Sequence, residues 1–159
     1  MDQAEGEHEQ SASQPWWRRH TRLLGLAVGL PCWAVLAVAL SLHANPLGYD
    51  THTQLGLRAC GFMQRQGLPC PTCGMTTAFT LMAHGHPLLA LWAQPFGAVL
   101  SLLTALAGLL TAAQVVSGRA ILLRLQPRAW WMWALLGGLV AGWALRLAMG
   151  LATHEYPVH

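Results

Sequence analysis

Long apolar runs separated by polar connectors dominate the pattern of this chain. Three of them, at residues 23–42, 96–116 and 129–149, hold about 20 residues each, which is the length that crosses the hydrocarbon core of a bilayer. The apolar region of a secretory signal peptide is shorter, at about 7–15 residues, so the first run is interpreted as a retained membrane anchor. We therefore predict three transmembrane helices, the first of which packs closely on a neighbour through Gly25 and Gly29.

The segment between the first two runs, residues 43–95, combines a polar loop with an amphipathic helix that follows it. The apolar face of this helix holds Met75, Phe79 and Met82, and its polar face holds Cys73, Thr76, Thr77, Thr80 and His84. The segment His84-Gly85-His86-Pro87 interrupts this helix, and Gln94-Pro95 interrupts it again. Histidines and helix breakers are costly at mid-membrane, so we predict that the broken helix lies along the membrane interface.

The third run carries two further signals. Ala134, Gly138 and Gly142 follow one another at steps of four and predict a packed helix face. Arg146 lies near the far end of the run, where a long side chain can reach the membrane surface, so we predict that it snorkels. The fold class is therefore an all-α integral membrane protein with three transmembrane helices and a broken interfacial helix.

The domain organisation follows from these runs. Residues 1–22 are predicted to form a disordered cytoplasmic tail that ends in an interfacial cluster of tryptophan and arginine. Residues 23–150 form one polytopic membrane domain, in which residues 43–95 supply the outer loop and the interfacial helix. Residues 151–159 are a short tail.

Composition supports lipid as the solvent of this domain. Hydrophobic residues make up 54% of the chain and charged residues 9%, whereas soluble domains carry about 25% charged residues. The basic side chains are all arginine and too sparse to follow a nucleic-acid backbone, so we expect the partners to be the lipid bilayer and other membrane proteins, with no nucleic acid.

Charge also predicts the orientation. With three spans and a cytoplasmic amino terminus, six of the nine arginines lie inside: Arg18, Arg19, Arg22, Arg119, Arg124 and Arg128. Counting the interfacial helix as a fourth span would leave fewer arginines inside, so the positive-inside rule favours three. This orientation predicts that the loop at residues 43–95 lies outside the membrane.

The chemistry of the chain is concentrated in the turn Cys70-Pro71-Thr72-Cys73-Gly74. Pro71 suits the first position of a helix, which makes Cys70 its capping residue. A helix amino terminus favours a thiolate, as in redox-active Cys-x-x-Cys sites, so Cys70 and Cys73 are catalytic candidates if the turn is redox-active. Gly74 and Thr76 are predicted to be structural, together with Pro71.

The same turn also resembles one half of a zinc site. Two thiolates on a tight turn form a zinc knuckle, and Cys60, ten residues upstream, is a candidate third ligand, which makes zinc the candidate metal. His43 or His52 in the preceding loop could supply a fourth ligand. His84 lies roughly 16 Å along a helix from Cys73 and is too far away. The remaining cysteine, Cys32, lies inside an apolar run and is interpreted as a small core residue.

The sequence contains few of the residues that other common kinds of catalysis need. Acidic residues in the folded region are limited to Asp50 and Glu155, so paired-carboxylate catalysis has almost no residues to use, and there is no Gly-rich phosphate-binding loop.

The turn and its surroundings resemble a family of small bacterial membrane proteins known only as a domain of unknown function. The shared features are an upstream cysteine matched by Cys60, and the signature Gly-x-x-Cys-Pro-x-Cys-Gly-x-Thr-Arg-Ala, matched from Gly67 to Ala78. This chain departs from the signature at Thr77, where the family has arginine, so no role of that arginine is carried over. The resemblance implies a location in a bacterial inner membrane and implies no reaction.

Three functional hypotheses follow. In the first, the protein is a non-enzymatic structural or partner-binding module whose outer turn is stapled by a disulfide or a metal. The second is a membrane thiol-disulfide oxidoreductase that uses Cys70 and Cys73. The third is a metal-handling protein that uses Cys60, Cys70 and Cys73.

Overall fold

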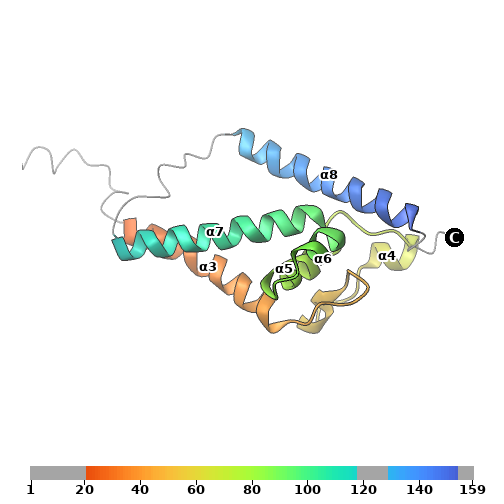
Figure 1. Ribbon diagram of the computed structural model, residues 1–159, viewed down its shortest axis with the longest axis horizontal. Helices are drawn as coiled ribbons and strands as arrows, with labels where there is room; N and C mark the ends of the chain where they lie inside the picture. The colour runs from red at the N-terminus through yellow and green to blue at the C-terminus, as the bar shows by residue number, and fades with distance from the viewer. Residues whose placement is uncertain (1–20, 118–128, 154–159) are drawn as a thin grey trace, which may run out of the picture.

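The computed structural model describes residues 21–117 and 129–153, and every regular element within these ranges is a helix. Three helices are long and apolar enough to cross a membrane by length and composition, namely α3 (Thr21–Ser41), α7 (Pro95–Ser117) and α8 (Trp130–Ala152). Shorter helices lie between α3 and α7 (Figure 1), namely η1 (Thr51–Leu55), α4 (Gly61–Gln66), α5 (Met75–Ala83) and α6 (Pro87–Ala93). The predicted fold class is confirmed in its all-helical character and its three long apolar helices.

Some predictions concern parts of the chain outside the described residues. These are the disordered tail, of which only Thr21 and Arg22 are described, the arginine-bearing connector at residues 118–128, and the chain end at residues 154–159.

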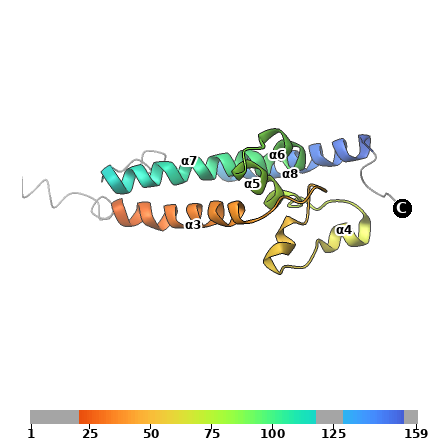
Figure 2. The same cartoon turned by 60° about the horizontal axis from the view of Figure 1, so that its bottom comes forward.

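Helices α3 and α7 run antiparallel and share the most extensive helix–helix interface of the described chain (Figures 1 and 2). Small residues allow this approach: a Cβ atom added at Gly25 would lie 2.9 Å from Cγ2 of Val115, and one added at Gly29 would lie 2.8 Å from Oγ1 of Thr111. The close packing predicted from these two glycines is therefore confirmed. 

Helices α5 and α6 form the predicted broken helix, and they pack across the beginning of α7. The break lies at Gly85, whose φ of +79° ends the helical path between them. On the face that the sequence marks as polar, Thr77 and Thr80 are completely buried. The reason is that their hydroxyls are satisfied inside the protein, by Thr51 for Thr77 and by the carbonyl oxygen of Thr76 for Thr80.

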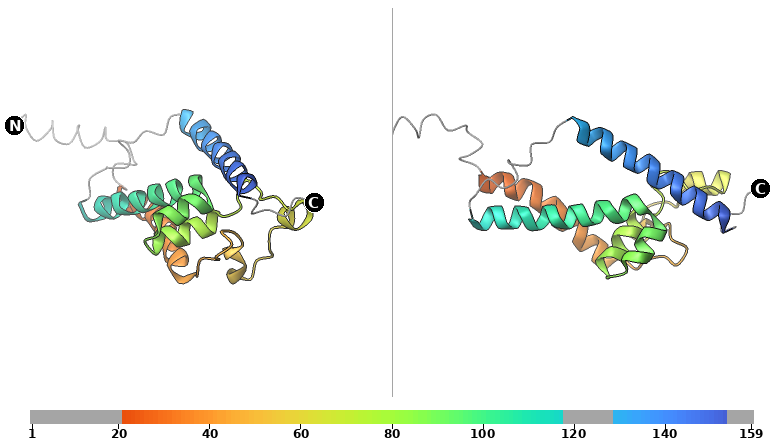
Figure 3. Two further views of the ribbon diagram at one scale, coloured as in Figure 1. Left: turned by 45° about the vertical axis from the view of Figure 1, so that its right-hand side comes forward. Right: turned by 45° about the horizontal axis from the view of Figure 1, so that its top comes forward.

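Of the other two long helices, α8 packs on α7, near the start of α7. Its amino-terminal half stands away from α7 (Figures 1 and 3), and a cavity of about 450 Å³ is lined by both helices. Near the middle of α8, a Cβ atom added at Gly138 or Gly142 would lie 2.9 Å or 2.7 Å from the Phe96 side chain. These two glycines form the predicted packed face, but Ala134 is exposed.

Arg146 does not snorkel. Its side chain is only 3% exposed, and its Nη1 group donates a hydrogen bond of 2.7 Å to the carbonyl oxygen of Trp92. Trp92 lies in the last turn of α6, where carbonyl groups lack helical partners and attract a cation. The prediction was wrong because α6 brings this acceptor close to α8, which removes the need to reach water.

The arrangement gathers the chemistry at one end of the molecule. Helix α3 ends, α7 begins and α8 ends on the same side, and the loop containing η1 and α4 lies there too (Figures 1 and 2). At the opposite end, the Gln114 side chain of α7 donates a hydrogen bond of 2.7 Å to the carbonyl oxygen of Thr21. The cysteine-bearing segment therefore lies at the end where it can contact α8 and the junction of α6 and α7.

Candidate metal centre

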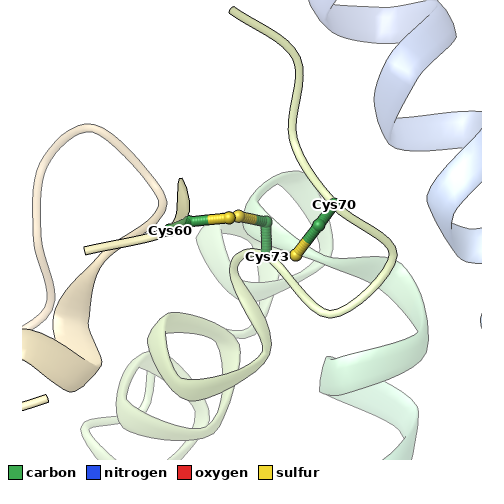
Figure 4. Close-up of side chains that lie close together, drawn as sticks. All are labelled: Cys60, Cys70 and Cys73. Carbon is green, nitrogen blue, oxygen red and sulfur yellow. The ribbon is translucent and has the colours of Figure 1, made fainter. Parts of the chain in front are cut away.

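Three of the four cysteines converge at this end of the molecule. Cys60 is the residue that caps α4, while Cys70 and Cys73 lie on the turn before α5. Their Sγ atoms all lie within 4.8 Å of one another (Figure 4). All four cysteines are free thiols, and Cys32, in the middle of α3, is not part of the group. The structure thus brings together the three cysteines that the sequence singles out.

The turn that holds Cys70 and Cys73 precedes the helix instead of beginning it. The backbone N–H of Cys73 donates to the carbonyl oxygen of Cys70 at 2.9 Å, which closes a tight turn with Pro71 at its second position. The fixed φ of proline suits that position. Helix α5 begins only at Met75, with Gly74 as its capping residue. The prediction that Cys70 caps the helix and Pro71 starts it was therefore wrong.

Gly74 is the reason for this difference. Its φ of +84° is left-handed and separates the turn from the helix. A Cβ atom added there would lie 2.7 Å from the carbonyl oxygen of Ala93 and 2.9 Å from that of Gly48. Only glycine fits both the backbone conformation and the space. Because the chain changes direction at Gly74, the free N–H groups at the start of α5 belong to residues after the cysteine turn.

Two side chains from later in the chain hold the cysteine turn through its backbone carbonyl groups. The indole N–H of Trp143, on α8, donates to the carbonyl oxygen of Pro69 at 2.9 Å. The side-chain amide of Gln94, between α6 and α7, donates to the carbonyl oxygen of Pro71 at 3.0 Å. Sequence reasoning missed both residues. The available signal was a polar group inside an apolar stretch, which must find a hydrogen-bond partner when it is buried.

Cys60 is held from the other side by η1 and its flank. The Oδ1 atom of Asp50 accepts a hydrogen bond of 3.2 Å from the backbone N–H of Cys60. Asp50 has a φ of +60°, the one positive value among the non-glycine residues of the described chain. The hydroxyl of Thr51 lies 2.8 Å from that of Thr77, which ties η1 to α5. These hydrogen bonds anchor the loop beside the cysteine turn without a metal ion or a disulfide.

A cavity of about 350 Å³ opens over the three thiols. It is also lined by Asp50 and His52, by the polar residues Thr72, Thr76 and Thr77, and by the start of α5. Of the three histidines weighed from the sequence, only His52 lines it. Thr76 also faces a second, apolar cavity of about 400 Å³ between α3, α5 and α7.

The electrostatics of the thiols are unequal. The pKa of Cys60 lies below its ordinary value: partial burial acts to raise it, but hydrogen bonds from the N–H of Met63 and from the thiols of Cys73 and Cys70 outweigh burial. The pKa of Cys73 is raised far above its ordinary value, first because the side chain is buried and then because its thiol donates to Cys60. Cys60 is therefore the thiol that ionises more readily of these two.

The spacing of the thiols suits a shared metal ion. Ligands placed tetrahedrally about 2.3 Å from a zinc ion lie about 3.8 Å from one another. Three sulfur atoms that already lie within 4.8 Å of each other need only a small contraction to reach that geometry. The donor set consists of thiols, which bind zinc and other soft or borderline ions as thiolates.

Comparisons with known proteins place this site inside a recognised family segment. Residues 60–108 match the family described as "Protein of unknown function (DUF2752)". The matched segment begins at Cys60, includes the cysteine turn, and ends within α7. This match confirms the predicted resemblance to a family of unknown function. Among the curated proteins and the solved structures, none matches the chain.

Proposed function

We propose that this protein is a non-enzymatic membrane protein whose three clustered thiols bind one metal ion, with zinc as the preferred occupant. The observation that carries the proposal is the mutual proximity of the Sγ atoms of Cys60, Cys70 and Cys73. A disulfide uses two thiols and leaves the third beside it, whereas a metal uses all three. The convergence of three thiols therefore favours the metal staple over the disulfide staple.

The role of the staple follows from what the turn touches. Trp143 and Gln94 hold its carbonyl groups, and Gly74 packs against the residue that precedes Gln94. A metal bound to Cys60 would join the loop to this junction. The bound ion would thereby fix the surface that the loop presents to other membrane proteins, with no chemical conversion of its own.

A second candidate function is thiol-disulfide exchange, and the unequal thiols favour it. The more readily ionised Cys60 would attack a substrate disulfide, forming a mixed disulfide and releasing one substrate thiolate. Cys70 or Cys73 would then attack the Cys60 sulfur, leaving an intramolecular disulfide and releasing the second substrate thiolate. This proposal assigns the attack to Cys60, whereas the sequence alone suggested attack by Cys70 and resolution by Cys73 or Cys60.

The proposal includes an orientation. The amino terminus is placed in the cytoplasm of a bacterial cell and the metal centre on the outer side of the inner membrane, on the strength of the arginine distribution. The fold is compatible with this, because the loop that holds η1 and α4 lies at the opposite end of the long helices from the start of α3 and the end of α7 (Figure 1).

Metal titration of cysteine variants tests the proposal. The full chain, purified in detergent and reduced, would be titrated with Co²⁺, whose thiolate complexes absorb strongly in the near ultraviolet. We expect saturation at about one ion per chain. Cys60→Ser, Cys70→Ser and Cys73→Ser should each lower the affinity sharply and reduce the thiolate absorption by about one third, because each removes one of three thiolates.

Cys32→Ser is the matched control, because Cys32 lies outside the group and should leave the titration unchanged. Wild-type protein that binds no Co²⁺ or Zn²⁺ would overturn the proposal. If the wild type binds no metal and the double variant Cys70→Ser/Cys73→Ser accumulates a mixed disulfide at Cys60, thiol-disulfide exchange replaces the metal centre as the proposed function.

A further inference from the structure

The loop around η1 carries a side chain whose placement suggests a further role. His52 lines the same cavity as the three thiols, whereas His84 hydrogen-bonds to the carbonyl oxygen of Thr80 on α5. The backbone N–H and carbonyl of His43 are both occupied by the side chain of Gln54, and His43 does not line the cavity. His52 is therefore the histidine positioned to meet an ion held by the thiols.

The hydrogen bonding of His52 determines which of its nitrogen atoms can bind a metal. Its Nε2 atom lies 3.0 Å from the carbonyl oxygen of Arg58, which can only accept, so Nε2 carries the proton and donates. Oδ1 of Asp50 lies 4.0 Å from the same nitrogen. A neutral imidazole with its proton on Nε2 presents a lone pair at Nδ1. Metal-binding histidines are held in this way, with the other ring N–H given to a carbonyl or a carboxylate.

We propose that Nδ1 of His52 is the fourth ligand of the metal centre, with the carbonyl oxygen of Arg58 fixing its tautomer. The centre is then a closed Cys3His site of the structural zinc type, and the segment Thr51–Leu55 acts as the strap that closes it. This inference rests on the proposed metal centre. A fourth protein ligand makes the site a structural one. An open site with three thiolates would instead pass a metal on or activate a water molecule.

The proposal requires the strap to move toward the thiols. His52 is not among the ligand atoms that lie within 4.8 Å of one another, so η1 must close over the thiols when an ion binds. Its surroundings allow this: the flanking residue Gly56 has a φ of +77° with nothing within 4 Å of an added Cβ atom, and the His52 side chain is 27% exposed. The hydrogen bond between Thr51 and Thr77 keeps the strap beside α5 while it closes.

The test compares His52→Ala with His43→Ala in the full chain, purified in detergent. We expect His52→Ala to weaken zinc binding by about 10-fold or more, the scale of loss seen at residues that support metal sites, while His43→Ala binds like wild type. X-ray absorption at the zinc edge should show imidazole scattering in wild type and in His43→Ala but not in His52→Ala. Added free imidazole should restore part of the affinity of His52→Ala, because it can occupy the vacated position.

The other outcomes are each decisive. Zinc affinity and imidazole scattering that are unchanged in His52→Ala would overturn the fourth ligand and leave the three-thiolate centre standing. Loss of imidazole scattering in His43→Ala would assign the ligand to that residue and overturn the proposal. If His52→Ala does not fold, His52→Gln, read by the same scattering signature, replaces it. Failure of the wild-type protein to bind zinc would overturn the metal centre itself.

Discussion

At the scale of single residues, the three clustered thiols should differ in reactivity when they are free of metal. The pKa of Cys60 is lowered, so its thiolate is present at lower pH than that of an ordinary cysteine, while the pKa of Cys73 is raised and keeps it protonated. We expect an alkylating probe near neutral pH to modify Cys60 before Cys73, and the rate at Cys60 to rise at a lower pH than for a free thiol. Time-resolved peptide mass spectrometry of reduced, chelator-treated protein measures this order.

The same experiment in denaturant provides the control, because all thiols should then react alike. Faster modification of Cys73 than of Cys60 in the folded protein would contradict the hydrogen-bond pattern around the thiols.

A second residue-scale prediction concerns Gly74. Gly56→Ala places a side chain at a left-handed φ with nothing within 4 Å, and should cost about 1–2 kcal/mol of unfolding free energy. Gly74→Ala meets the same backbone strain and adds contacts of 2.7 Å and 2.9 Å with two carbonyl oxygens. Its cost should therefore be larger, and it should also weaken metal binding because the turn must shift. Denaturant unfolding of both variants in detergent separates the backbone strain from the cost of the close contacts. Equal losses of unfolding free energy would show that the close contacts of Gly74 with the two carbonyl oxygens are unimportant.

At the scale of elements, α8 should stabilise the cysteine turn through one hydrogen bond. Trp143→Phe removes the donor to the carbonyl oxygen of Pro69 while keeping most of the ring. We expect a loss of about 0.5–1.5 kcal/mol in unfolding free energy and a measurable weakening of zinc binding. Trp133→Phe is the matched control on the same helix, because Trp133 is 71% exposed. Equal behaviour of the two variants would mean that α8 does not support the turn.

The elements also show what sequence reasoning could reach. The long apolar helices and the break at Gly85 were predictable, because length, hydropathy and helix breakers are local properties of the chain. The start of α5 was not predictable from the sequence. Pro71 prefers the first position of a helix, but the left-handed backbone of Gly74 ends that path, and the close contacts of Gly74 with other parts of the chain stabilise this backbone conformation. The burial of Arg146 depends on a carbonyl group contributed by another helix, which no local pattern records.

In the candidate site, too, some residues could be predicted from the sequence and others could not. Spacing alone brought Cys60, Cys70 and Cys73 into one hypothesis, and their convergence could be anticipated because they share one loop. The supports contributed by Gln94 and Trp143 come from residues far along the chain, so only the folded arrangement identifies them.

At the scale of the whole molecule, the arrangement of the long helices leads to a test of orientation. We expect a membrane-impermeant maleimide to label the protein on intact bacterial cells after mild reduction and chelation, because the cysteine turn is proposed to face outward. A variant that lacks Cys60, Cys70 and Cys73 should not be labelled, since its remaining cysteine lies within α3. Labelling of the wild-type chain only after lysis would reverse the orientation.

The central claim is that three thiols of one folded chain share a single metal ion. Elemental analysis of protein purified in detergent without added metal, combined with thiol titration before and after chelation, tests it most directly. The account predicts about one zinc ion per chain and three thiols that become reactive only when the ion is removed. Protein that contains no metal and yields two of these thiols only after reduction would contradict the claim and identify the site as a disulfide.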